Sequence, residues 1–275
     1  MVTAAFFFSL MSLLVKLAGQ RLPTAEIVFA RSVVMLVISF ILVRQARLMM
    51  WGRRRSLLIL RGLVGFGALF CFFYAVTKLP LADITVIHFT NPVFTALFAS
   101  LFLKESMGRR EVSGLILCVV GVALVAQPSF LFGSGARNLD LFAVGVALCA
   151  SLLSSVAYTT VRKLGETDHH LVVIFYFSLI STPASIPLMV GHFLWPTPLE
   201  WLMLLGVGIV THSAQIFLTK GLHRERAGRA MSMSYVQVLF AATWGLVFFG
   251  EIPNAISGVG AVLIFGGTLL VARRV

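Results

Sequence analysis

The sequence predicts an all-α integral membrane protein with ten transmembrane helices. We expect the helices to form an inverted 5+5 repeat, with the N- and C-termini in the cytoplasm. Three observations lead to this prediction: an apolar composition, ten apolar segments long enough to cross a bilayer, and an internal repeat at a fixed separation of 146 residues.

The composition excludes a water-soluble globular protein. Of the 275 residues, 59% are apolar and only 12% are charged, whereas about a quarter of a soluble domain is charged. The lipid bilayer is therefore an expected partner. The net charge of +12 does not indicate nucleic-acid binding, because membrane proteins collect Lys and Arg on their cytoplasmic side.

Ten apolar segments account for almost the whole chain. A spanning helix needs about 20 residues, and the breaks between the segments carry Pro, Gly or charged residues. No connection is long enough for an extramembrane domain. The segments run over residues 2–18, 24–43, 56–77, 81–103, 111–127, 139–161, 170–190, 199–219, 227–249 and 254–272.

The internal repeat relates the fourth and fifth segments to the ninth and tenth. Residues 89–126 align without a gap with residues 235–272, giving ten identities in 38 positions. The identical pairs include Glu105 with Glu251, Gly114 with Gly260, and Gly121 with Gly267. A repeat at this period points to a duplicated architecture.

The distribution of basic residues gives the orientation. With a cytoplasmic N-terminus, 16 Lys and Arg residues fall on the inside and four on the outside, which places both termini in the cytoplasm. Each repeat then holds five helices, an odd number, so the second copy crosses the membrane in the opposite sense. We expect the first repeat at residues 1–128 and the second at residues 138–275. Inverted repeats are typical of secondary transporters, whose substrate sites lie at the repeat interface.

Several motifs resemble the EamA domain of the drug/metabolite transporter superfamily. They are residues 74–83 (YAVTKLPLAD), 90–94 (TNPVF) and 103–105 (LKE), followed by Gly114 and Gly121. In the second half Tyr235-Val236-Gln237 replaces Thr-Asn-Pro, so a kink in the fourth helix need not recur in the ninth. The resemblance implies ten helices, a central cavity lined by helices 1–4 and 6–9, and peripheral helices 5 and 10. It also implies transport of amino acids, other metabolites or drugs, often outward.

Arg31 is the clearest candidate for a substrate contact. It lies roughly 12 Å into the second apolar segment at 1.5 Å per residue, where a charge is costly and usually faces a cavity or a partner. A guanidinium can hold a substrate carboxylate through two hydrogen bonds. A structural pair with Glu26, or capping of helix-end carbonyls, is the alternative.

His88 and Asn91 are three residues apart in the fourth segment and so share a helix face. Pro92 frees a backbone carbonyl one turn earlier, which together with Asn91 could contact a polar substrate. Tyr74 lies near the end of the third segment. Hydrogen bonds between helices would explain these polar residues equally well.

The second half offers a matching set of polar and amphipathic residues. Gln237 is the repeat counterpart of Asn91, and two amides at equivalent positions could face each other across the axis between the halves. Packing or lipid contact is the alternative for the aromatic members. The full set of second-half candidates is Tyr158, Tyr176, His212, Gln215, Tyr235, Gln237 and Trp244.

Other singular residues are expected to be structural. Glu105 and Glu251 would cap the next helix or pair with basic groups, and the repeated glycines would allow helices 5 and 10 to pack closely. The three cysteines lack metal or redox spacing. We therefore expect no metal site, no catalytic residue and no cofactor.

These patterns together indicate a secondary transporter, not an enzyme. The expected activity is alternating-access export of small organic solutes, most plausibly amino acids or related metabolites, in a bacterial inner membrane. An exporter of the YddG type within the superfamily fits the aromatic interior. No nucleotide-binding loop occurs, so proton coupling through His88 or His212, uniport and exchange all stay open. An intramembrane lipid-modifying enzyme and a non-transporting membrane receptor are the alternative functions. The sequence leaves open whether the chain is a monomer or a homodimer.

Overall fold

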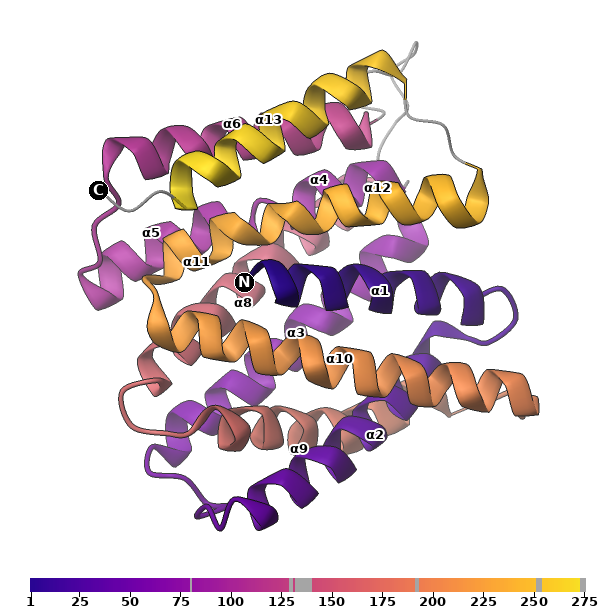
Figure 1. Ribbon diagram of the computed structural model, residues 1–275. Helices are drawn as coiled ribbons and strands as arrows, with labels where there is room; N and C mark the ends of the chain where they lie inside the picture. The colour runs from indigo at the N-terminus through magenta and orange to yellow at the C-terminus, as the bar shows by residue number, and fades with distance from the viewer. Residues whose placement is uncertain (80, 129–130, 132–139, 191–192, 251–253, 273–275) are drawn as a thin grey trace.

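The computed structural model describes residues 1–79, 81–128, 131, 140–190, 193–250 and 254–272, and every regular element in this part of the chain is helical (Figure 1). The elements are α1 (Val2–Ala18), α2 (Thr24–Gln45), α3 (Arg55–Lys78), α4 (Leu81–His88), α5 (Asn91–Leu103), α6 (Arg109–Ala126), α8 (Leu141–Leu164), α9 (His170–Met189), α10 (Pro198–Arg224), α11 (Ala227–Ser232), the 3₁₀ turn η1 (Met233–Tyr235), α12 (Val236–Phe249) and α13 (Ala255–Ala272).

These helices confirm a multi-pass membrane protein. Eight spans in the described part of the chain are long and apolar enough to cross a bilayer, and α1 is a shorter apolar helix. One of the eight combines α4 with α5, and another combines α11, η1 and α12. The fifth predicted segment, residues 111–127, corresponds to α6, which begins with the charged residues Arg109, Arg110 and Glu111.

The helix boundaries repeat with the separation found in the sequence. The end of α1 at Ala18 corresponds to the end of α8 at Leu164, 146 residues later, and the starts of α2 and α9 differ by the same number. The same separation relates the ends of α3 and α10, the starts of α4 and α11, the ends of α5 and α12, and both ends of α6 and α13. The repeat therefore extends over the fold and is not confined to the aligned 38 residues.

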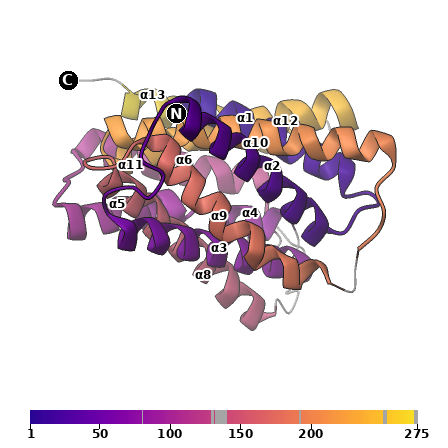
Figure 2. The ribbon, with the colours of Figure 1, turned by 90° about the horizontal axis from the view of Figure 1, so that it is seen from below.

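Helix packing follows the same two-fold relation. The contact of α1 with α10 corresponds to the contact of their counterparts, α8 with α3. In the same way, the contact of α2 with α10 corresponds to that of α9 with α3. The α2–α9 and α6–α13 contacts each join a helix to its own counterpart. Figure 1 shows α6 beside α13 and α1 beside α10, and Figure 2 shows α2 beside α9. Each of these contacts joins one half to the other, so the halves interlock instead of packing as separate bodies.

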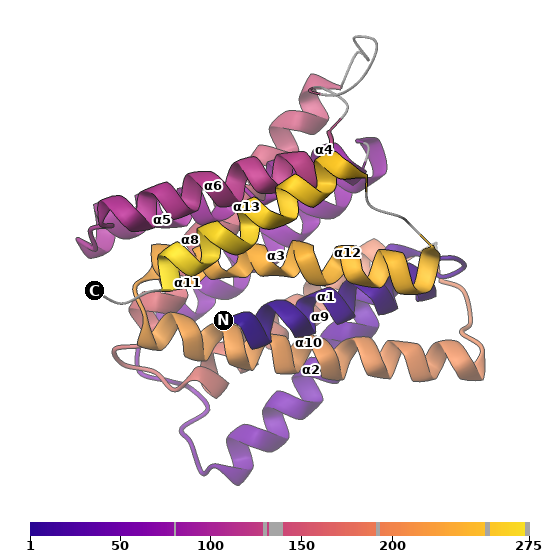
Figure 3. The same cartoon turned by 45° about the horizontal axis from the view of Figure 1, so that its top comes forward.

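The α6–α13 pair forms one edge of the bundle, as Figures 1 and 3 show. Gly114 lies against Gly267, and Gly121 lies against Gly260, so closely that a Cβ on any of the four would come within 2.7 Å of a carbonyl oxygen of the opposite helix. The outer faces of the pair expose apolar side chains such as Ile116 and Val262. The glycines therefore pack two peripheral helices together, as the sequence predicts.

The fourth span is broken after His88, as Pro92 predicts, because α4 ends there and α5 begins at Asn91. The ninth span is interrupted at the equivalent position by the 3₁₀ turn η1, although it has no proline there. The sequence left open whether a kink would recur in the ninth helix, and the structure has an interruption there in the form of this 3₁₀ turn.

Both ends of the described chain lie at one end of the bundle. Met1 contacts the α10 backbone beside Gly221, and Arg229 on α11 donates hydrogen bonds to the carbonyls of Val271 and Ala272. Because α10 leads directly into α11, the start of α1 and the end of α13 both contact this stretch of the chain. Glu251, predicted to mirror Glu105, lies outside the described residues.

Candidate functional site

The break between α4 and α5 is surrounded by polar groups. The Asn91 side chain donates its Nδ2 hydrogen to the His88 carbonyl oxygen at 2.8 Å. This is the carbonyl that Pro92 leaves without its helical partner, so the side chain of Asn91 satisfies it and the expected free carbonyl is not available. The Asn91 Oδ1 and the His88 Nδ1 are both buried and have no partner in the described structure.

A row of hydroxyls on α8 faces this break. Ser155 Oγ donates to the Asn91 backbone carbonyl at 2.9 Å, and Ser151 Oγ lies 2.8 Å from Thr90 Oγ1. Sequence analysis did not identify Ser151 and Ser155. Their spacing of four residues on one helix face was the signal that could have revealed them.

Arg31 is buried in the third turn of α2, with 8% of its surface exposed. Its Nε has no hydrogen-bond partner, and among the described residues neither a hydrogen bond nor an ion pair joins it to Glu26. Glu26 instead accepts from the backbone N–H of Leu194 at 3.1 Å. The structural pairing considered above is thus not formed here.

Arg61 on α3 is a second buried arginine, 4% exposed, that the sequence analysis did not select. Its guanidinium lies over the ring of Phe177 on α9, with Cζ 4.5 Å from the ring centroid, and it interacts electrostatically with Tyr158 on α8. Nε and Nη1 have no hydrogen-bond partner. The signal for Arg61 was the same as for Arg31, a lone arginine inside an apolar segment.

His212 and Gln215 lie on one face of α10 and are both buried. The His212 Nδ1 is 3.4 Å from Ser39 Oγ on α2, and the His212 Nε2 is buried without a partner. The ring therefore has one nitrogen free for a proton or a ligand.

Four aromatic candidates are held by packing and hydrogen bonds. Tyr235 is fully buried and donates to the Phe89 carbonyl at 2.9 Å, while Tyr176 donates to the Trp51 carbonyl at 3.0 Å. Trp244 donates through Nε1 to Ser9 Oγ at 3.0 Å. Tyr74 packs edge-on against Phe142, with ring centroids 6.0 Å apart.

Gln237, the counterpart of Asn91, lies in the first turn of α12 and is half-buried. Asn91 and Gln237 thus both occupy the start of the longer helix that follows an interruption. That the two amides face a common substrate stays a prediction.

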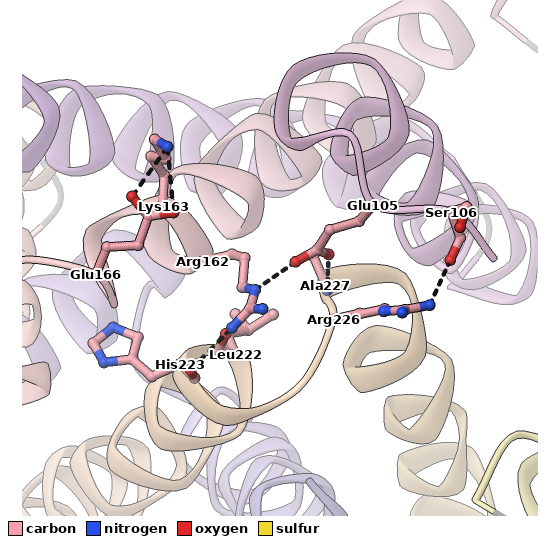
Figure 4. Close-up of polar contacts among 9 residues, drawn as sticks. All are labelled: Glu105, Ser106, Arg162, Lys163, Glu166, Leu222, His223, Arg226 and Ala227. Carbon is pink, nitrogen blue, oxygen red and sulfur yellow. Dashed lines mark hydrogen bonds and ion pairs between the residues drawn. The ribbon is translucent and has the colours of Figure 1, made fainter. Parts of the chain in front are cut away.

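A separate ion-paired cluster joins the ends of several helices (Figure 4). The Glu105 carboxylate accepts a hydrogen bond from Arg162 Nε at 2.7 Å. It accepts a second one at 2.8 Å from the backbone N–H of Ala227, which is the first residue of α11. Arg162 Nη1 also donates to the carbonyls of Leu222 and His223 at the end of α10. Glu105 thus pairs with a basic group and caps a helix, as predicted, but the helix is α11 and not the next helix in sequence. This arrangement ties α5, α8, α10 and α11 together, beside a surface cavity of about 130 Å³.

Comparison with known proteins gives the family. The model of the EamA-like transporter family matches residues 1–127 and again residues 141–273. The chain belongs to the EamA-like transporter family. As such, this EamA-like protein is a membrane transporter and not an enzyme, and its place in the drug/metabolite transporter superfamily agrees with the motifs in the sequence.

Named relatives of this EamA-like transporter include transporters from bacteria and mammals. The pseudopaline exporter CntI of Pseudomonas aeruginosa is 35% identical over 273 residues, which cover 99% of this chain and 94% of that protein. Human solute carrier family 35 member G1 is 30% identical over 98% of this chain and 77% of its own. A solved crystal structure with 18% identity superposes with a TM-score of 0.87 over 98% of this chain and 94% of its own, which supports the fold.

Proposed function

We propose that this protein is a secondary exporter of small organic solutes, most plausibly amino acids or related metabolites, in a bacterial inner membrane. Arg31 carries the proposal. It is a buried guanidinium without an ion-pair partner among the described residues, and it lies on α2, which packs against its repeat counterpart α9. A buried charge within a spanning helix is the feature expected of a transport site. The name of the Pseudomonas relative, an exporter, favours the outward direction.

The two-fold relation supports alternating access. We place the two halves at residues 1–128 and 138–275. If each half adopted in turn the conformation of the other, the centre of the bundle would open first to one side of the membrane and then to the other. The interruptions at α4–α5 and η1 lie at equivalent positions in the halves and supply places where the spans can bend. The excess of Lys and Arg at the end that holds the termini supports a cytoplasmic location for that end.

The buried polar groups favour exchange or uniport over a carboxylate proton relay. Of the buried carboxylates, Glu26 accepts one backbone hydrogen bond, and Asp168 accepts from the backbone N–H groups of Arg53 and Arg54. Both lie close to helix ends. Proton coupling would therefore fall to His88 or His212.

Uptake into sealed proteoliposomes, with a panel of amino acids and metabolites, tests the proposal. Arg31→Gln is expected to lower the uptake of carboxylate-bearing solutes by about 10- to 100-fold, the worth of hydrogen bonds to a charged group. Arg44→Gln is the matched control, because Arg44 is exposed at the end of the same helix. Asn91→Ala tests the amide at the α4–α5 break. Folded wild-type protein that moves no solute in the panel would refute transport and favour a receptor.

A further inference from the structure

We propose that a pocket at the end of the bundle that holds the chain termini binds the phosphate headgroup of an anionic phospholipid. The pocket measures about 340 Å³ and lies between the start of α6, the start of α11 and the last turn of α13. Figure 1 shows these three helix ends together. We call it the arginine pocket, and its charged lining consists of Arg109, Arg110, Glu111, Arg226 and Arg229. None of these residues is a candidate for solute binding, so the inference goes beyond the proposed export function.

The arginine pocket carries an excess of positive charge. Four arginines and one carboxylate among the described residues line it, which gives a net charge of +3. The carboxylate of Glu111 accepts a hydrogen bond from the Gly108 backbone N–H at 2.8 Å. Within the described chain it forms no ion pair with any of the four arginines. An anion that enters the pocket therefore meets positive charge that Glu111 offsets only in part.

Two of the four arginines are held in position by backbone carbonyls of other segments. Arg226 Nη1 donates to the Ser106 carbonyl at 2.9 Å (Figure 4). Arg229 donates through Nε and Nη2 to two carbonyls in the last turn of α13, at 3.0 and 2.9 Å. Its Nη1 also lies 3.9 Å from a carboxylate oxygen of Glu225. These contacts fix both guanidinium groups at the pocket and leave Arg226 without a counter-charge there.

The other two arginines, Arg109 and Arg110, line the pocket from the first turn of α6. Both are exposed, and neither side chain forms a hydrogen bond or an ion pair with another described residue. The first backbone hydrogen bond of α6 runs from the Val112 N–H to the Gly108 carbonyl, so the N–H groups before Val112 have no partner within the helix. A phosphate can accept hydrogen bonds from guanidinium groups and from a helix start at the same time.

The surroundings of the arginine pocket favour a lipid over a free phosphate. Leu270 lines the pocket and is 36% exposed. Its neighbour Leu269 is exposed as well, and so are Val112 and Ile116 on α6. Exposed apolar side chains on spanning helices contact acyl chains, and basic pockets between such helices bind anionic lipid headgroups. A phospholipid can cover the apolar edge while its phosphate occupies the pocket, whereas a free phosphate fits only the charged part.

A headgroup in the arginine pocket would also join the two repeats. Helix α6 belongs to the first half of the chain, and α11 and α13 belong to the second. Lipid bound at all three helix ends stabilises their contact by mass action. We therefore expect phosphatidylglycerol to raise the Tm of the protein in detergent more than phosphatidylcholine with the same acyl chains does.

Native mass spectrometry of the purified protein tests the site, with phosphatidylglycerol and phosphatidylcholine of identical acyl chains supplied in equal amounts. Wild-type protein should retain phosphatidylglycerol preferentially. Arg109→Gln combined with Arg110→Gln should reduce this preference by about 30-fold, since each arginine at a membrane surface contributes about a factor of five. Arg53→Gln combined with Arg55→Gln is the matched control and should leave the preference unchanged. Both of these arginines are exposed beside the start of α3 and are not part of the pocket lining.

Equal losses in the two double variants would show only a general attraction of basic residues for anionic lipid, and would overturn the site. Absence of a headgroup preference in wild-type protein, or displacement of the lipid by inorganic phosphate, would also overturn it. Arg109→Lys combined with Arg110→Lys keeps the charge but loses the planar fork, and we expect it to retain part of the preference. The Tm of each variant without added lipid checks folding and should change little, because the substituted side chains are exposed.

Discussion

At the scale of single residues, Glu105 is a structural anchor that can be tested without knowing the substrate. Its carboxylate holds Arg162 and the N-terminus of α11 at once, with only 15% of its side chain exposed. Glu105→Ala leaves a partly buried arginine unpaired and a helix uncapped. We expect a loss of about 1–3 kcal/mol in stability, seen as a lower Tm in detergent.

Glu166→Gln is the matched control for Glu105. Glu166 is 56% exposed and pairs with Lys163 at 3.0 Å three residues earlier, and such surface pairs contribute less than about 1 kcal/mol. Equal Tm values for both variants would show that the Glu105 contacts do not stabilise the bundle.

Single-residue reasoning from the sequence located part of the candidate site. A lone arginine in an apolar segment identified Arg31, because the cost of burying a charge does not depend on tertiary detail. Arg61 carries the same signal inside the third apolar segment, but it was not selected as a candidate. The hydroxyls of Ser151 and Ser155 were also missed, since small polar residues occur throughout membrane helices as packing groups.

At the scale of elements, the α6–α13 contact depends on glycine. Adding a Cβ at Gly114 would bring it within 2.7 Å of the Gly267 carbonyl and of a Val271 methyl group. Gly114→Ala should therefore separate the helices and destabilise the protein by about 1–3 kcal/mol, the usual cost of overpacking. Thermal unfolding followed by circular dichroism measures this change.

Gly258 and Gly266 on α13 supply the control, because a Cβ at either position meets nothing within 4 Å. Gly266→Ala should be neutral or stabilising by up to about 1 kcal/mol, since Ala is the better helix former. A loss at Gly266 as large as that at Gly114 would rule out close packing as the reason for the glycine.

The length of each apolar segment was enough to predict that a helix forms there. An interruption within a helix could be predicted only where the sequence has a proline. Pro92 removes a backbone donor and so marks the α4–α5 break in the sequence. The η1 turn has no such residue, and Tyr235 beside it is held by a hydrogen bond to Phe89, 146 residues earlier. The hydrogen bond beside the second interruption joins two residues at equivalent positions of the repeat. The order of residues along the chain does not show such a contact.

At the scale of the whole molecule, orientation is still a prediction from charge. In a variant without the three native cysteines, Arg21→Cys should react with a membrane-impermeant thiol reagent in intact cells. Glu166→Cys should react only after the cells are opened. Both side chains are about half exposed, so access depends on the side of the membrane. The reverse pattern would place the termini outside and contradict the positive-inside assignment.

The inverted repeat was the most informative large-scale feature in the sequence. Ten identities and one constant separation implied counterpart helices, and the helix boundaries follow that separation across both halves. The identity of the packing partners could not be obtained in this way. Which helices touch across the two-fold axis, such as α2 with α9, depends on side-chain shapes in three dimensions.

Solute counterflow in sealed proteoliposomes tests the central claim most directly. Vesicles preloaded with an unlabelled solute that the uptake panel identifies are diluted into a trace of the labelled solute. An alternating-access carrier should accumulate the label transiently above its equilibrium level, because each outward passage of unlabelled solute returns the site for an inward one. Label that enters without an overshoot, as through an open pore, would contradict the account.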